Sequence, residues 1–208
     1  MAVTREAEAK GRRSVVVAGV SLAGKSALAR RLCGSFEPPL PFVEGDGLHA
    51  GSDRRRMSDG HALAEADRSA WLDRVAARIA SAPDGGLQVV TCSCLSRASR
   101  DVLRRAGPVA FVFLLLSPDE ARRRAARRLG AEPAHFFQPA RYPALLEGQF
   151  RDLEPPTASA DTRVLDADGL FGPGALEMEV AGVRRWLVSV HGAGKISSGS
   201  PRTPRGGA

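Results

Sequence analysis

The chain has 208 residues, 43% hydrophobic and 25% charged, a composition typical of one globular domain and not of a disordered chain. Its longest apolar run, residues 109–116, is too short to span a bilayer, and residues 1–13 lack the apolar core of a signal peptide. We therefore expect a cytoplasmic protein with no membrane partner. Most of the net charge of +7 lies in residues 1–13 (+2) and 191–208 (+3), so we expect no specific nucleic-acid partner.

Apolar runs alternate with amphipathic stretches between residues 14 and 190. Strands are predicted at 14–18, 41–44, 87–91, 109–116 and 163–166, and helices at 25–32, 68–81, 96–105, 119–129, 144–153 and 176–190. Because the strands are apolar on both faces, we expect an α/β fold, in which helices flank both faces of a central parallel sheet of about five strands. Ligands of such sheets bind at the carboxyl ends of the strands.

Three segments depart from this alternation. Residues 130–156 contain five prolines and are predicted to form a lid inserted into a domain of residues 14–190. Residues 1–13 form a basic N-terminal tail, and residues 191–208, rich in Gly, Ser and Pro, a disordered C-terminal tail. The three cysteines are too few for a disulfide framework and are interpreted as buried, reduced thiols.

A phosphate-binding loop is predicted between the first strand and the first helix. The eight residues fit G-x-x-x-x-G-K-[ST], and they are Gly19, Val20, Ser21, Leu22, Ala23, Gly24, Lys25 and Ser26. Backbone N–H groups and the helix N-terminus surround the phosphates, Lys25 bridges the terminal phosphates, and the Ser26 hydroxyl ligates Mg²⁺. Lys25 is also the one lysine between residues 14 and 190, which disfavours an ordinary glycine-rich turn. We therefore expect ATP and Mg²⁺ as cofactors.

The second strand ends in Glu44-Gly45-Asp46, where a carboxylate beside the phosphate loop can accept a proton from a hydroxyl or hold Mg²⁺. Taken alone, this tripeptide is equally compatible with a turn. The sequence has no N-K-x-D string, which GTPases need, and the third strand does not end in the Asp usual in motor ATPases. Small size with a lid favours a small-molecule kinase.

Four stretches, in order and over roughly residues 14–168, resemble the gluconokinases of the shikimate-kinase-like P-loop group. They are GVSLAGKS at 19–26; VEGDGLH at 43–49 with Met57; Cys92-Ser93 with Arg100-Asp101; and Arg128-Leu129 with His135-Phe136 and Gln149-Phe150 before Pro156. The resemblance implies a P-loop kinase that transfers phosphate from ATP to the 6-hydroxyl of D-gluconate. A sugar acid is the small-molecule partner, and a homodimer is left open.

Carried over residue by residue, the resemblance makes Lys25 and Asp46 catalytic, and Ser26 and Asp46 metal ligands. It places residues 19–26 and Arg128 on ATP. On the acceptor it places Asp46, His49 and Arg100. Arg56, which stands where the family has lysine, is the further cation expected to bind the acceptor.

The departures from the family motifs lie mainly on the acceptor side, at Ala50, Asp53, Arg56, Ser96, Ser99 and Glu132. Two other functions are therefore kept: a kinase for another small polyol or acid, such as a shikimate-like or antibiotic hydroxyl, and a nucleotide-binding module without acceptor chemistry. Trp71 is interpreted as a core residue, and the arginines of 122–128 as mostly a solvated helix face with one or two at the phosphates.

Overall fold

The computed structural model describes residues 13–58, 64–82, 86–129 and 142–191. Three predicted segments lie largely outside the described residues. Of the predicted N-terminal tail only Arg13 is described, and of the predicted C-terminal tail only His191, at the end of the last helix. The first part of the predicted lid also lies outside them. Within them, no helix is both long and apolar enough to cross a membrane.

The central sheet has five parallel strands, as the alternating pattern predicts, and their order is β2-β3-β1-β4-β5. Its register places Val16 of β1 beside Val90 of β3 on one side and Phe111 of β4 on the other. The strands are β1 (Arg13–Gly19), β2 (Phe42–Val43), β3 (Leu87–Cys92), β4 (Val109–Leu115) and β5 (Thr162–Asp166).

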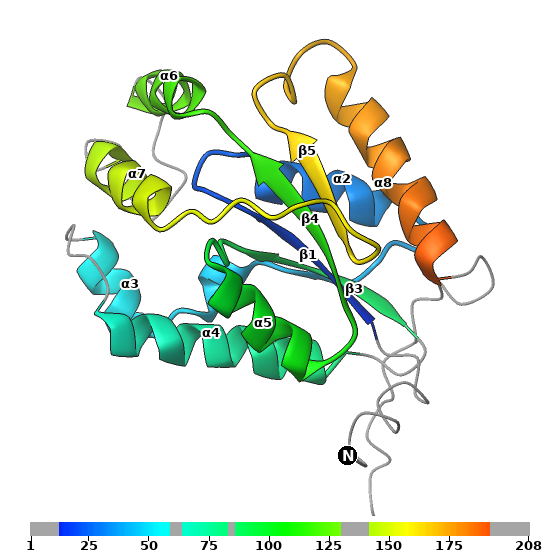
Figure 1. Cartoon of the computed structure of the whole chain (residues 1–208), viewed down its shortest axis with the longest axis horizontal. Coiled ribbons are helices and arrows are strands. Elements are labelled where there is room, and N and C mark those ends of the chain that lie inside the picture. The colour runs from blue at the N-terminus through cyan, green and yellow to red at the C-terminus, as the bar shows by residue number, and fades with distance from the viewer. Residues whose placement is uncertain (1–12, 59–63, 83–85, 130–141, 192–208) are drawn as a thin grey trace, which may run out of the picture.

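Helices cover both faces of the sheet (Figure 1). Helices α2 (Lys25–Gly34) and α8 (Ala175–His191) contact each other on one face. Helices α4 (Glu65–Ala80) and α5 (Arg97–Ala106) contact each other on the other face. The carboxyl ends of the strands face a third group, made of the 3-10 helix η1 (Gly45–Leu48), α3 (Gly51–Ser58), α6 (Pro118–Leu129) and α7 (Tyr142–Arg151).

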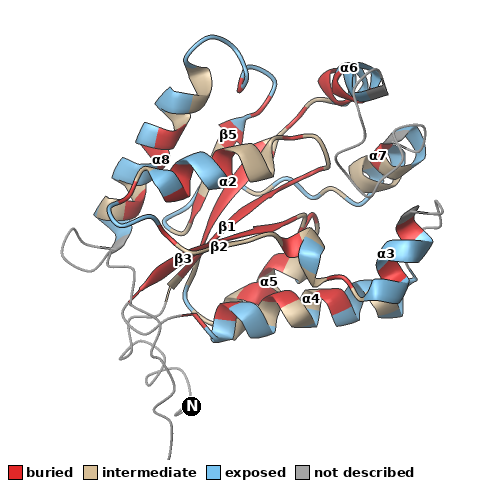
Figure 2. Cartoon of the chain, turned by 180° about the vertical axis from the view of Figure 1, so that it is seen from behind, coloured by how far each residue is buried: buried red, intermediate tan, exposed pale blue. Residues whose placement is uncertain are grey.

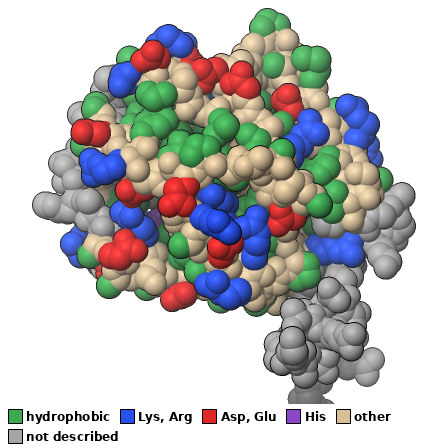
Figure 3. Space-filling model, in the orientation of Figure 1, with side chains coloured by type: hydrophobic (Ala, Val, Ile, Leu, Met, Phe, Trp, Pro, Cys, Tyr) green, Lys and Arg blue, Asp and Glu red, His purple; other side chains and the backbone are tan. Residues whose placement is uncertain are grey.

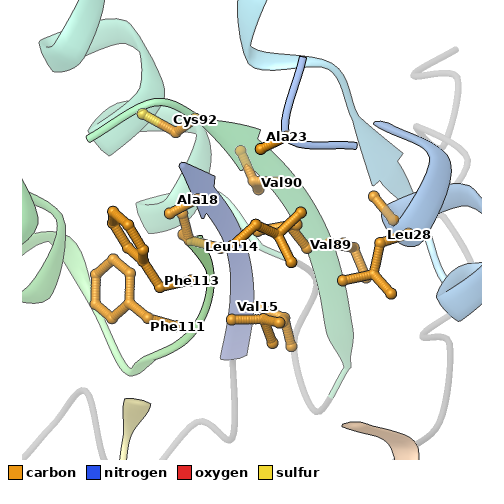
Figure 4. Packing of buried hydrophobic residues seen from close by; sticks show 14 of the residues in the cluster. Val15, Ala18, Ala23, Leu28, Val89, Val90, Cys92, Phe111, Phe113 and Leu114 are labelled. Atoms are coloured by element: carbon orange, nitrogen blue, oxygen red, sulfur yellow. The ribbon is translucent and has the colours of Figure 1, made fainter. Parts of the chain in front are cut away.

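The core lies between the sheet and these layers, and Figure 2 shows buried residues along the strands and on the inner sides of α4 and α5. In Figure 4, Phe111 and Phe113 project from one side of the sheet, and Leu28 of α2 packs on the other. Each fully buried side chain of this size stabilises the fold by about 1.5–3 kcal/mol. The core therefore fixes the strand ends at which the loops carrying polar residues begin.

Two expectations about single residues are confirmed. Trp71 is a core residue, with 5% of its surface exposed. Cys33, Cys92 and Cys94 are buried free thiols, and burial raises the pKa of Cys33 to about 11. A thiol with so high a pKa stays protonated at neutral pH and behaves as a small apolar side chain.

Candidate active site

The predicted phosphate loop joins β1 to α2 at the centre of the sheet. Gly24 precedes the helix with φ 101°, and a Cβ there would lie 2.8 Å from the Phe171 ring, so this position accepts only glycine. The Lys25 ammonium donates a hydrogen bond to the Val20 carbonyl at 2.9 Å, which holds it across the loop. The loop residues are thus gathered in one turn at the carboxyl end of β1.

A cavity of about 1180 Å³ lies over this loop and extends along the carboxyl ends of the strands to both sides of it. Its middle is lined by Ser21, Leu22, Gly24, Lys25, Ser26 and Ala27 of the phosphate loop and α2. On the side of β2 it is lined by Arg30, Glu44, Asp46, Gly47 and Arg54, which we call the β2 end. On the side of β5 it is lined by Glu120, Arg124, Arg127, Arg128, Asp168, Phe171 and Gly172, which we call the β5 end.

Glu44 connects the β2 end to the phosphate loop. Its Oε1 accepts hydrogen bonds from Ser26 Oγ at 3.0 Å and from the Thr91 hydroxyl, and its Oε2 accepts one from Arg30 at 3.3 Å. Sequence reasoning assigned the strand-end role to Asp46 alone and missed Glu44. The signal was present, because both carboxylates belong to the same Glu-Gly-Asp turn.

The turn itself is fixed against β3. The Gly45 N–H donates to Thr91 Oγ1 at 3.0 Å, and a Cβ on Gly45 would lie 1.9 Å from the Thr91 carbonyl oxygen. Only glycine permits this approach, so the motif's central residue brings the two carboxylates to the cavity. Asp46 lines the cavity directly, together with Lys25 and Ser26.

His49 lies beneath this turn and does not line the cavity. Its ring stacks on Trp71 with centroids 4.7 Å apart and 7° between the planes, and only 7% of the residue is exposed. Trp71 Nε1 donates to the Gly45 carbonyl at 2.8 Å, so the stacked pair supports the turn from below. Burial lowers the pKa of His49, although the charges of Asp46 and Asp53 oppose this shift.

Two arginines predicted to contact the acceptor also lie away from the cavity lining. Arg100 is 4% exposed, and its guanidinium donates to the carbonyls of Cys94, Leu95 and Glu154 at 3.2, 2.6 and 2.8 Å. Arg56 forms an ion pair with Asp67 at 3.1 Å on the surface. Arg54, two residues before Arg56, lines the cavity instead and was missed because α3 itself was not predicted.

The β5 end is built around Arg124, which is 8% exposed and therefore departs from the solvated face expected for this arginine-rich helix. Its guanidinium donates to the carbonyls of Leu22, Ala167 and Asp168 and lies 4.9 Å from the Phe171 ring centroid. Hydrogen bonds from Arg123, Arg124 and Arg127 lower the pKa of Glu120 to about 2. Arg128 lines this end.

Helix α7 also contacts the phosphate loop, since Gln149 Oε1 accepts a hydrogen bond from the Ser21 N–H at 2.6 Å. The segment after α7 is joined to the β3–α5 loop by the Glu154 N–H, which donates to the Leu95 carbonyl at 3.2 Å. The described part of the predicted lid thus lies against both the phosphate loop and the neighbouring loop after β3.

The sheet has this strand order, a glycine-rich phosphate loop after the central strand β1, and a carboxylate after β2, the next strand along the chain. Together these features define a small-molecule P-loop kinase. The sequence matches no family model. It is 35% identical over 157 residues to a probable gluconokinase of Saccharomyces cerevisiae, covering 71% of this chain and 77% of that protein. The chain belongs to the gluconokinase family.

Two solved structures agree. A sugar kinase from Janibacter sp. is 30% identical with a TM-score of 0.69, and covers 89% of this chain and 99% of its own. A gluconokinase from Sinorhizobium meliloti is 32% identical with a TM-score of 0.63, and covers 89% of this chain and 95% of its own. The predicted α/β P-loop kinase fold is therefore confirmed.

Proposed function

We propose that the protein transfers the γ-phosphoryl group of ATP to the 6-hydroxyl of D-gluconate and so forms 6-phosphogluconate. The observation that carries this proposal is the meeting of Lys25, Ser26 and Asp46 in one cavity. These are a cation, a hydroxyl and a carboxylate, the three kinds of group that phosphoryl transfer to an alcohol requires. Gluconate as the acceptor rests on the family to which the chain belongs.

The cavity suits a magnesium–nucleotide complex. Ser26 Oγ and the carboxylate of Asp46 are hard oxygen ligands of the kind that Mg²⁺ prefers, and they line the cavity beside the phosphate loop. Within the described ranges no cluster of three or more His, Cys, Asp or Glu side chains could hold a metal ion. In this proposal Mg²⁺ would be bound as its complex with ATP, and its role would be to neutralise charge on the phosphate oxygens.

The chain's own residues divide the remaining work. The phosphate-loop N–H groups and Lys25 stabilise the negative charge of the transferring phosphoryl group, and Arg128 faces the phosphates from the β5 end. Asp46 accepts the proton of the acceptor hydroxyl as the new P–O bond forms, and Glu44 orients Ser26. His49 and Trp71 hold the turn that carries Asp46.

The experiment is ADP release by the purified protein with Mg·ATP and D-gluconate, followed by proton-coupled ³¹P NMR of the product. A phosphate on the terminal carbon couples to two protons and gives a triplet, whereas one on any inner carbon gives a doublet. Gluconate-dependent ADP release with a triplet is the expected result. ADP release with another acceptor but not with gluconate would indicate a kinase of another specificity. No acceptor-dependent ADP release at all would indicate a nucleotide-binding module without acceptor chemistry.

Figure 3 shows Lys and Arg interspersed with Asp and Glu over the face it draws, with no area of one sign covering that face. The predicted absence of a specific nucleic-acid partner, the cytoplasmic location and the homodimer stay predictions.

A further inference from the structure

The proposed acceptor carries a carboxylate, and the β2 end of the cavity already holds two acidic side chains, Glu44 and Asp46. A further carboxylate placed beside these two is repelled unless a cation compensates for its charge. Since Lys25 belongs to the transferring phosphate, the acceptor carboxylate needs another cation near the β2 end. The question is which arginine is available.

Most arginines around this end already have fixed partners. Arg30 pairs with Glu44 at 3.3 Å, and Arg74 donates to the Leu48 carbonyl at 2.6 Å and to Asp53 at 3.2 Å. Arg56 pairs with Asp67, and the guanidinium of Arg100 is buried among three carbonyls. Ser96, at the position where the resembling motif has lysine, accepts a hydrogen bond from the Ser99 N–H at the start of α5.

Among the arginines that line this end of the cavity, Arg54 is the exception. It is exposed and lines the cavity, and its side chain makes no hydrogen bond or ion pair with any residue that the structure describes. Its backbone N–H donates to the Ala50 carbonyl at 3.0 Å, so its Cα is fixed in the first turns of α3 while its guanidinium is not engaged. Burial is the main cause that lowers the pKa of His49, and the positive charge of Arg54 is a smaller one. The charge of Arg54 therefore acts near the turn that carries Asp46.

We propose that Arg54 binds the carboxylate of the acceptor and selects anionic over neutral acceptors. This inference rests on the proposed kinase function and names the residue that recognises the sugar acid. Asp46 of η1 and Arg54 of α3 line the same end of the cavity, so one linear acceptor presents its terminal hydroxyl to Asp46 and its carboxylate to Arg54. A guanidinium makes two parallel hydrogen bonds to a carboxylate, which a neutral hydroxyl cannot match.

The test compares D-gluconate with D-glucitol, the neutral polyol in which the carboxylate is reduced to an alcohol. Specificity constants for both are measured on wild type, Arg54→Ala and Arg54→Lys. Arg55→Ala is the matched control, because Arg55 is the exposed neighbour on the same helix and does not line the cavity. The melting temperature of each variant and its KM for ATP are recorded alongside.

We expect Arg54→Ala to lower kcat/KM for gluconate by about 10- to 100-fold, mainly through KM, with glucitol and ATP changed by less than about twofold. Arg54→Lys keeps part of the preference for gluconate, and Arg55→Ala keeps all of it. An unchanged gluconate-to-glucitol ratio in Arg54→Ala overturns the inference while gluconate phosphorylation by wild type stands. Failure of wild type to phosphorylate gluconate overturns the proposed function instead.

Discussion

The two ends of the cavity are built in different ways. At the β5 end, Arg124 is fixed by three backbone carbonyls and Glu120 by three arginines. At the β2 end, Glu44 is held by Ser26, Thr91 and Arg30, but Asp46 and Arg54 make no side-chain hydrogen bond or ion pair within the described residues. Helix α6, which carries Glu120 and Arg124, and helix α3, which carries Arg54, lie apart along the strand ends, with α7 between them (Figure 1).

This difference suggests a division of tasks. A preorganised network costs no reorganisation when a ligand with a constant shape arrives, which suits the nucleotide. Unengaged side chains on a short helix can be exchanged without loss of the fold, which suits the part of the site that selects the acceptor. Substitutions should therefore separate into those that abolish transfer, those that destabilise the fold and those that change acceptor preference.

The largest effect is expected at the middle of the cavity. Lys25→Ala removes the cation that the transferring phosphoryl group requires, so kcat should fall by about 10³-fold or more. The melting temperature should change little, because the Lys25 side chain donates its hydrogen bond to a carbonyl of its own loop. Near-normal turnover in this variant would remove the assignment of the phosphate loop.

Asp46→Asn tests the carboxylate of the β2 end that is proposed to accept the proton. The amide keeps the shape of the carboxylate but cannot accept the hydroxyl proton, so kcat should fall by about 10²- to 10⁴-fold with the fold intact. Asp73→Asn is the control, since Asp73 is an exposed acid on α4 outside the cavity lining. If only the KM for the acceptor rises, Asp46 binds substrate and another group accepts the proton.

Arg100 belongs to the fold in this comparison, in contrast to the acceptor role implied by the family resemblance. Arg100→Met removes the side-chain donor of the Cys94 and Glu154 carbonyls and one of the two donors of the Leu95 carbonyl, so the free energy of unfolding should drop by roughly 3 kcal/mol. KM values of the folded variant should stay within about twofold of wild type. Arg97→Ala on the same helix is the control, because that side chain is 82% exposed. A raised acceptor KM at full stability would return Arg100 to the acceptor site.

The smallest effect concerns His49. Because burial holds its pKa in the folded state below the ordinary value of 6.5, the unfolded state binds the proton more readily. The neutral ring's contribution to stability is therefore complete above pH 6.5 and declines as the pH falls below it. In urea unfolding at pH 7.5 and 5.5, His49→Phe, which keeps the stack on Trp71, should lose less stability on acidification than wild type, by up to about 1 kcal/mol. Equal losses would show that His49 is not the titrating group.

The sequence predicted the sheet and the phosphate loop because both depend on local patterns. β-branched runs identify β1, β3 and β4, and the eight-residue motif identifies the loop. Helix α3 was missed because its sequence, GSDRRRMS, has a single apolar residue and hence no helical periodicity. Without that helix, only comparison with the family motif distinguished among Arg54, Arg55 and Arg56, and it favoured Arg56.

Burial was the other quantity that the sequence did not supply. A motif gives the position of Arg100 but not the direction of its guanidinium, which depends on carbonyls 5, 6 and 54 residues away. The same holds for Glu44, whose partners are Ser26 at the start of α2 and Thr91 in β3. Side-chain orientation toward the cavity is a tertiary property, and it separated the residues that line the site from those that support it.

If the β5 end of the cavity binds the nucleotide and the β2 end binds a sugar acid, the wild-type protein should prefer a sugar acid as acceptor. The ranking of acceptors by the wild-type protein is the most direct test. ADP release with saturating Mg·ATP gives kcat/KM for D-gluconate, D-glucitol and shikimate under one set of conditions. We predict that gluconate exceeds the other two by at least about tenfold, because only a linear sugar acid presents a terminal hydroxyl to Asp46 and a carboxylate to Arg54. A value for glucitol or shikimate equal to or above that for gluconate would contradict this prediction.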